Sequence, residues 1–298
     1  MPWAFITRLF KEVSLFLIDN PILLFALLAA STASIAGGLM GTYIVAKRIV
    51  FLSGSISHAV LGGIGFFLWL KSQHGYKWAN PLIGALFAAI LSAILLGWIR
   101  MRFKEREDTL IAAIWSTGMA VGVIFMALTP GYNVELTNFL FGNILWASPT
   151  EVAILAGFDG LLLLLTFLNH KRFLAVCFDE QQAMMQGVRV KGLYMLLLCM
   201  VGVSIVLLIQ VVGAILVVAM LAIPPAIAAL LSNRLSRIMG IAILIGIGIS
   251  ASGIGIAYHL NWPPGATIAL AAAIVYLIFL KFKENTSLLR SSSKRSFF

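Results

Sequence analysis

The residue in this chain best suited to bind a ligand in an apolar environment is His58, within the segment SISHAVLGG. It lies about halfway along an apolar stretch at positions 49–70. An ionisable side chain at such a place is costly unless it faces protein, water or a ligand. A neutral imidazole binds divalent transition metals well, and it also serves as a hydrogen-bonding contact between helices. The segment alone leaves both interpretations open.

Small residues surround His58 at helical spacing. Gly54 and Ser55 come four and three residues before it, and Gly62 follows four residues after it. Residues three and four apart share one face of a helix. We therefore predict that these three residues form a small, polar wall lining a channel past His58.

A second candidate ligand is Asp159, in the segment GFDGLLLLL. A carboxylate near the middle of an apolar run is a candidate functional residue by default, so we predict Asp159 as a metal ligand together with His58. The alternative is that the span is shifted along the sequence and leaves Asp159 near an interface.

The elements that must position these residues are membrane-spanning helices. The chain has 298 residues, of which 61% are hydrophobic and only 11% charged, whereas soluble domains carry roughly 25% charged residues. Apolar runs of about 20 residues, enough to cross a hydrocarbon core about 30 Å thick, recur from end to end. We predict an all-α, polytopic transmembrane bundle of eight or nine spans, because the two runs that meet at Gly213 are hard to separate. The nine runs are 22–45, 49–70, 79–99, 109–129, 150–168, 193–209, 211–231, 238–258 and 264–280.

Charge predicts the orientation in a cell membrane. The net charge is +10, and most Lys and Arg residues sit in short loops between apolar runs, which is typical of cytoplasmic loops rather than of nucleic-acid binding. The loop at 130–149 has no Lys or Arg and is expected outside. The C-terminus then falls inside, and the N-terminus outside if all nine runs cross.

Three parts of the chain are expected: an amphipathic lead-in at 1–21, a transmembrane domain at 22–282 and a basic cytoplasmic tail at 283–298. Cys177 and Cys199 form no metal motif and are predicted to be free thiols. Pairs of glycines four residues apart predict close helix packing; they are Gly37 with Gly41 and Gly118 with Gly122.

The segment AIPPAIAALLSNRLSR, at 222–237, ends a long apolar run with two prolines. Pro224 and Pro225 are expected to break the preceding helix. Residues 226–235 would then form a short helix on the cytoplasmic surface, with Arg234 toward water, and such a helix suits docking into a partner's groove. An ordinary turn between two spans is the alternative.

The chain has no motif for hydrolysis or nucleophilic catalysis. It contains neither a GxxxxGK[ST] phosphate loop nor a G-x-S-x-G elbow. Any ATP-driven activity must therefore use hydrolysis on another chain. An intramembrane enzyme that uses His58 and Asp159 is a minor alternative.

Several segments together resemble the membrane permeases of metal-importing ABC transporters, the zinc, manganese and iron family. The resemblance implies a permease that pairs with a second permease chain, accepts a metal from an extracytoplasmic binding protein and is driven by cytoplasmic ATP-binding subunits. It also implies that the coupling helix meeting the ATPase contains Pro224, Pro225, Ala226, Ala228 and Arg234. The matching segments are SISHAVLGG, DTLIAAIWSTGMAVGV, LFGNILWAS, CFDEQQAMMQGV, VVGAILVVAMLAIPPAIAALL and WPPGATI.

The sequence departs from this family at the candidate site. Many similar permeases carry an aspartate four residues before the histidine, and this chain has Gly54 there. His58 matches the histidine of the family motif. The oxygen ligand missing at position 54 would come from Asp159 or from a partner permease. The metal is expected as substrate, without a resident cofactor, and a permease for a metal chelate is the alternative.

Overall fold

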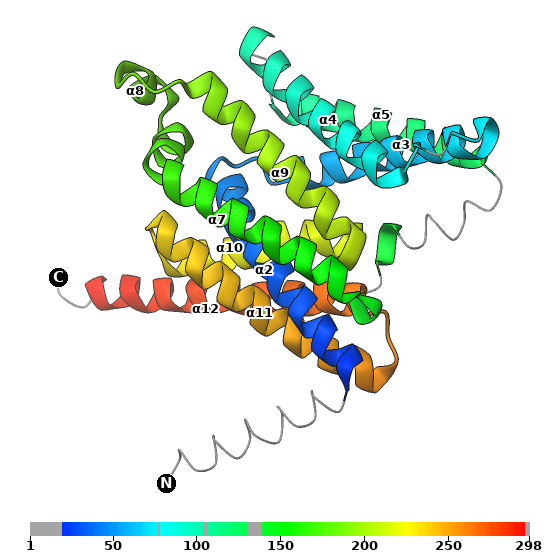
Figure 1. Ribbon diagram of the computed structural model, residues 1–298. Helices are drawn as coiled ribbons and strands as arrows, with labels where there is room; N and C mark the ends of the chain where they lie inside the picture. Colours follow the sequence, from blue (N-terminus) through cyan, green and yellow to red (C-terminus); the bar gives the residue numbers. More distant parts are fainter. Residues whose placement is uncertain (1–19, 77, 104–106, 130–138, 143, 296–298) are drawn as a thin grey trace.

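The computed structural model describes residues 20–76, 78–103, 107–129, 139–142 and 144–295 (Figure 1). The predicted lead-in at 1–21 lies almost entirely outside these residues. All the elements bounded within them are helices, namely α2 (Pro21–Ala46), α3 (Phe51–His74), α4 (Pro81–Phe103), α5 (Glu107–Ala127), the 3-10 helix η1 (Ile144–Trp146), α7 (Pro149–Phe178), α8 (Glu180–Met185), α9 (Val190–Val212), α10 (Ala214–Leu231), α11 (Leu235–Leu260) and α12 (Pro264–Arg295).

Nine helices in the described ranges are long and apolar enough to cross a membrane, which confirms the upper of the two predicted numbers. The doubtful boundary is resolved at Gly213, which separates α9 from α10. Its backbone has φ 81° and ψ 157°, a conformation that is essentially restricted to glycine. The chain can therefore reverse direction at this single residue.

Local sequence signals account for several helix ends. α7 begins with a capping box, in which the Ser148 hydroxyl accepts from the Glu151 amide while the Glu151 carboxylate accepts from the Ser148 amide at 2.8 Å. Asp179 caps the N-terminus of α8, and its side chain accepts from two backbone amides at 2.9 Å. α3 ends at Gly75, in the left-handed conformation with φ 66°.

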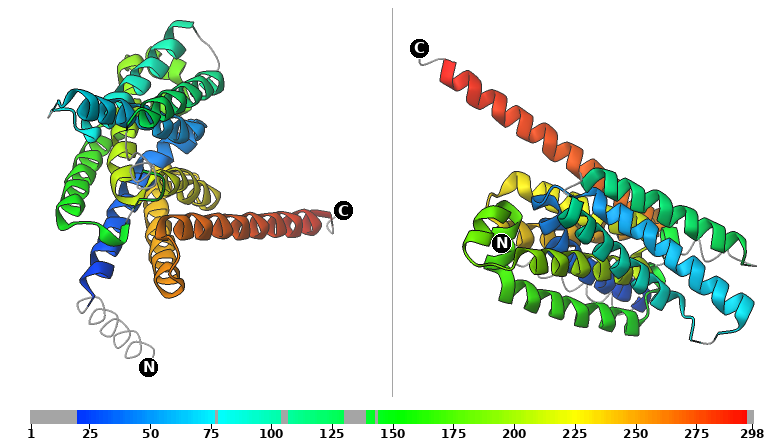
Figure 2. Two further views of the ribbon diagram at one scale, coloured as in Figure 1. Left: turned by 90° about the vertical axis from the view of Figure 1, so that its right-hand side faces the viewer. Right: turned by 90° about the horizontal axis from the view of Figure 1, so that it is seen from above.

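The helices form two groups (Figures 1 and 2). In the central group, α2 packs on α7, α9, α10 and α11, and α12 packs on α10 and α11. In the second group, α3 packs on α4 and α5. The two groups meet mainly where α4 and α3 contact α9.

Alternation of the spans brings the basic helix ends to one side of the molecule. The short helix α8, the turn between α10 and α11 and the C-terminal end of α12 all lie toward the left of Figure 1. We call this the inner side, following the expected cytoplasmic placement of basic loops. The predicted basic tail begins within α12, which continues as a helix to Arg295.

The prediction that two prolines end a helix is wrong. Pro224 and Pro225 lie inside α10, which continues through Ala226 to Leu231. Ala228 is fully buried, with 0% of its surface exposed, and the coupling role of this segment stays a prediction. After α10 there is only a short turn, in which Arg234 is exposed.

Packing against α2 explains why the helix tolerates both prolines. A proline has no N–H to donate to the carbonyl four residues earlier, so the Met220 and Leu221 carbonyls lose their helical partners. Both carbonyls lie against glycines of α2. The Met220 oxygen would lie 3.2 Å from a Cβ on Gly37, and the Leu221 oxygen would collide with a Cβ on Gly41. The predicted close packing at these two glycines is therefore confirmed, and it accommodates the freed carbonyls.

Candidate functional site

The closest helix pair around His58 is α3 with α5. Ser55 Oγ donates to the Ile111 carbonyl at 2.9 Å, which fixes the two helices near their inner ends. One end of the contact is therefore held by a hydrogen bond. Further along, a Cβ on Gly62 would lie 2.9 Å from the Gly118 carbonyl oxygen, and Gly122 packs on the backbone of Leu61. The predicted close packing at Gly118 and Gly122 is confirmed.

His58 lies between these two anchors. Its imidazole stacks on the indole of Trp115, with ring centroids 4.9 Å apart and an angle of 18° between the planes. The residue is half-buried, and its Nδ1 atom is buried without a hydrogen-bond partner among the described residues. The ring is thus held by stacking, and no hydrogen bond is recorded at its buried nitrogen.

The three residues predicted to line a channel face α5. Gly54 is covered by the Trp115 indole, Ser55 uses its hydroxyl on α5, and Gly62 lies against the α5 backbone. Protein therefore fills the sides of these residues that point toward α5. Their contribution to a channel wall stays a prediction.

Asp159 is in a different environment from His58. It is only 3% exposed, and neither carboxylate oxygen has a hydrogen-bond partner in the described ranges. Its helix, α7, packs on α2 and α9, whereas α3 packs chiefly on α5 and α4. Asp159 and His58 therefore belong to different helix contacts within the chain, and the role of Asp159 as an oxygen ligand stays a prediction.

The described part of the chain offers no cluster of three or more His, Cys, Asp or Glu side chains that could hold a metal ion. A resident metal centre would need such a cluster. His58 can supply one nitrogen ligand, and further ligands would have to come from water or from another chain. Cys177 and Cys199 are free, as predicted.

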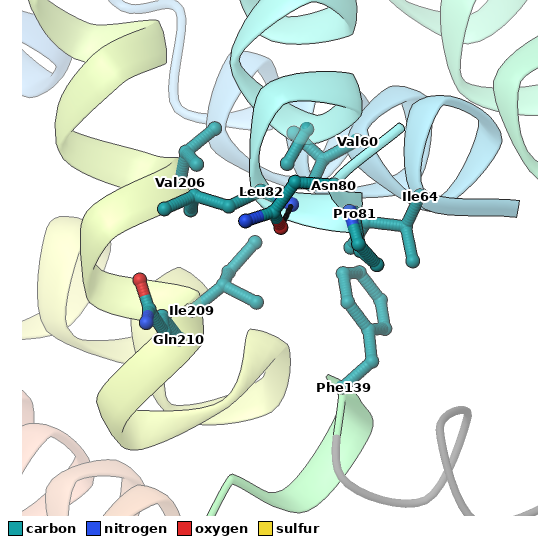
Figure 3. A pocket seen from close by; sticks show the side chains of 10 residues that line it. Val60, Ile64, Asn80, Pro81, Leu82, Phe139, Val206, Ile209 and Gln210 are labelled. Atoms are coloured by element: carbon teal, nitrogen blue, oxygen red, sulfur yellow. Dashed lines mark hydrogen bonds between the residues drawn. The ribbon is translucent and has the colours of Figure 1, made fainter. Parts of the chain in front are cut away.

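A pocket of about 270 Å³ opens between the middle of α3 and the outer ends of α4 and α9 (Figure 3). Its walls are mostly apolar, and Phe139 closes one side. Two carboxamides, from Asn80 and Gln210, are its polar groups. The sequence placed Gln210 near the outer surface, but it gave no indication that Asn80 would join it.

On the inner side, one carboxylate connects both helix groups. Glu180, at the start of α8, forms ion pairs with Lys47 and, at 2.9 Å, with Arg100. Lys47 follows α2 in the central group, and Arg100 belongs to α4 in the second group. The Tyr194 ring of α9 lies 4.3 Å from the Arg100 guanidinium carbon and 5.5 Å from Lys47 Nζ. We call these four residues the inner cluster.

The inner cluster favours an ionised Glu180. Burial acts to raise the pKa of this carboxyl, but the hydrogen bonds and positive charges of Lys47 and Arg100 outweigh it and hold the pKa below its ordinary value. Next to the cluster, Phe178, Met184 and Met185 are exposed. The first residue of α8 is therefore held by two ion pairs, while apolar side chains at and beside this helix are exposed.

Comparisons with known proteins agree on one family. The family described as the ABC 3 transport family matches residues 19–283. A relative from Chlamydia pneumoniae, named a probable metal transport system membrane protein, is 49% identical over 263 residues, covering 88% of this chain and 89% of that protein. A chelated iron transport system membrane protein of Yersinia pestis is 31% identical over 260 residues and covers 87% and 84%. Among solved structures, PsaBC from Streptococcus pneumoniae in complex with Fab matches with a TM-score of 0.77 and 31% identity, covering 91% and 95%.

Proposed function

This chain belongs to the ABC 3 transport family, and from that premise we propose that it is the permease subunit of an importer for divalent transition-metal ions, zinc, manganese or iron. The metal is the substrate, and a separate ATPase supplies the energy. Relatives named for metal transport support this substrate class. Membership of a transport family makes the chain a transport protein rather than an enzyme.

The observation that carries the proposal is the environment of His58. An imidazole on a membrane-spanning helix, half-buried and without a recorded partner at Nδ1, is a suitable transient ligand for a transition metal. A conducting site must bind the ion strongly enough for entry and weakly enough for release. One nitrogen ligand per chain meets both requirements better than a complete metal centre would.

A second permease chain, identical or different, would complete the site. α5 packs on α3 and α4 but keeps large apolar side chains exposed on its other side, including Met119, Val123 and Ile124. Lipid can cover such a surface, and so can a partner helix. A partner placed there would bring its own ligands toward His58, and a different permease chain could supply the carboxylate that this chain lacks at position 54.

The ATPase would meet the inner side at α8 and at the turn carrying Arg234. α8 is short, and its exposed residues Met184 and Met185, together with Phe178 at the end of α7, offer an apolar contact surface beside the inner cluster. Movement of α8 would pull on α2 through Lys47 and on α4 through Arg100. The extracytoplasmic metal-binding protein would dock on the opposite side, where the pocket with Asn80 and Gln210 opens.

A permease for a metal chelate is the second candidate. It is favoured by the lack of a protein ligand cluster in the described ranges, since a chelate brings its own ligands. The relative named for chelated iron transport points the same way.

Uptake by the reconstituted complex tests the proposal. The chain, its ATPase and its binding protein would be placed in proteoliposomes and supplied with radiolabelled zinc, manganese or iron(II). We expect uptake that requires ATP and both partners. Uptake of none of the free ions, but of an iron chelate, would favour the second candidate and overturn the first.

A further inference from the structure

We propose that Trp115 is the positioning residue for His58, and that position 54 is glycine because the Trp115 indole occupies the space beside it. This inference rests on the proposed function, in which His58 binds the passing metal. It deepens that function by assigning the geometry and the ligand preference of the site.

The Trp115 indole lies across one turn of α3. It stacks on the His58 ring at 4.9 Å. Its Cζ3 and Cη2 atoms would lie 3.1 and 3.2 Å from a Cβ added to Gly54. Gly54 and His58 are four residues apart and therefore share one face of the helix. The indole thus fills the gap that a side chain at position 54 would otherwise enter.

The register of the two helices is fixed on both sides of this stack. One turn before Trp115, the Ile111 carbonyl accepts from Ser55 Oγ. Three residues after it, a Cβ on Gly118 would lie 2.9 Å from the Ala59 backbone nitrogen. Because both neighbouring turns are held, the indole cannot slide along α3 without breaking a close backbone contact. Trp115 is 37% exposed. Part of its surface is therefore open, while one face of the indole covers His58.

Stacking restricts how His58 can bind a metal. A ring nitrogen donates its lone pair in the plane of the imidazole, so an indole over the face of the ring leaves the edge available. It also limits rotation of the side chain before the ion arrives. Pre-organisation of this kind strengthens binding without adding a ligand.

The same indole determines which ligands are absent. Gly54 carries no oxygen, and a larger side chain there would press on the indole. The chain therefore contributes an imidazole nitrogen without a carboxylate at this turn. Nitrogen ligands suit zinc and iron(II), whereas manganese prefers oxygen. We infer that the site favours zinc or iron(II) over manganese.

The first test compares two Trp115 variants in the reconstituted complex. Trp115→Ala removes the stack, and we expect the apparent KM for radiolabelled zinc to rise about three- to tenfold while the maximal rate stays within about twofold, given the usual strength of aromatic pairs. Trp115→Phe keeps a ring and should restore the KM to within about twofold. Trp98→Ala removes a 53% exposed indole on α4 and serves as the matched control, with no change expected. If Trp115→Ala does not accumulate, Trp115→Leu replaces it, since leucine fills space without stacking.

The second test places a carboxylate at position 54 in two backgrounds. Gly54→Asp alone should displace the indole and reduce zinc uptake. In the Trp115→Ala background the new carboxylate has room, so the ratio of manganese to zinc uptake should rise several-fold. Equal effects of Gly54→Asp in both backgrounds would overturn the proposal.

The outcomes separate this inference from the proposed function. If the wild-type complex moves no metal, or if His58→Ala leaves uptake unchanged, the proposed function fails. If His58→Ala blocks uptake while neither Trp115→Ala nor Trp115→Leu changes the KM for zinc, the proposed function stands and this inference fails.

Discussion

His58 and Asp159 are both ionisable residues on membrane-spanning helices, yet they differ in burial and in their side-chain partners. His58 lies at the contact between α3 and α5, half-buried, with an aromatic partner on one face. Asp159 lies on α7, sealed against the central group, with neither oxygen partnered in the described ranges.

The difference shows that residue type and position in a span do not by themselves identify a transport path. A ligand residue needs a route to the ion as well as suitable chemistry. Beside His58, α5 is packed on α3 and α4 but keeps apolar side chains exposed, so a partner could approach from that side. Asp159 is only 3% exposed in the central group.

The largest expected effect comes from His58→Ala. Loss of the imidazole removes the nitrogen ligand, and we expect metal uptake to fall at least about tenfold with unchanged protein abundance. His74→Ala, at the exposed outer end of the same helix, is the control. If the variant takes up as much metal as the wild type, His58 is not on the transport path, and it no longer differs from Asp159 in this respect.

Gly118→Ala tests whether the α3–α5 contact holds His58 in place. The added methyl group would press on the Ala59 backbone, so the helices must separate. Overpacking of this kind costs about 1–3 kcal/mol, and we expect a lower melting temperature and about fivefold lower uptake. At Gly248 a Cβ meets nothing within 4 Å, so Gly248→Ala should lower neither quantity. If both variants behave alike, the contact is not a constraint on the site.

Glu180→Gln tests the connection between the two groups. The variant keeps the shape of the side chain but loses the charge that pairs with Lys47 and Arg100. We expect α8 to be held less firmly, and ATPase stimulation by the binding protein to fall about threefold while His58-dependent metal binding is retained. Co-purification of the ATPase and its activity would be measured together. Normal values of both would contradict the proposed docking on α8.

The inner cluster also predicts a pH dependence. Because the folded pKa of Glu180 lies below its ordinary value, its ionisation contributes stability above that ordinary value, and the contribution is lost as the pH falls through the folded pKa. Thermal stability of the wild type should therefore fall more steeply than that of Glu180→Gln in the acid range below about pH 4.5. Parallel curves would show that the cluster is not the titrating element.

The smallest effect is expected from Asp159→Asn. The carboxyl is sealed and separate from His58, and the amide has nearly the same shape, so uptake should stay within about twofold of wild type. Radiolabelled zinc uptake at saturating and limiting metal would be compared. A tenfold loss would place Asp159 in the path and would remove the distinction drawn here between the two residues.

Much of the fold could be predicted from the sequence, because a hydrocarbon core demands long apolar helices. Apolar runs predicted all nine spans, and the glycine pairs predicted close contacts that the structure confirms. The error at Pro224 and Pro225 has a physical cause. A lost helical hydrogen bond is a local penalty, whereas the glycines of α2 that accommodate the freed carbonyls lie far away in sequence.

The site was only half predictable. The position of His58 within an apolar stretch identified it, but its stacking partner could not be found, because the contact with Trp115 depends on the register between α3 and α5. Nor could spacing show that Gly54 faces an indole, or that the helix carrying Asp159 packs on α2 and α9. Glu180 was missed for the same reason, since its partners belong to α4 and to the end of α2.

Three glycines from distant segments meet at the outer surface. A Cβ on Gly142 would collide with the backbone at Gly213, and a Cβ on Gly265 would lie 2.8 Å from the Phe141 carbonyl oxygen. Gly265 belongs to α12, which is synthesised after the segments that carry the other two glycines. The contact between Gly265 and Phe141 can therefore form only after α12 has been made, and a nascent chain stalled before α12 would lack this part of the junction.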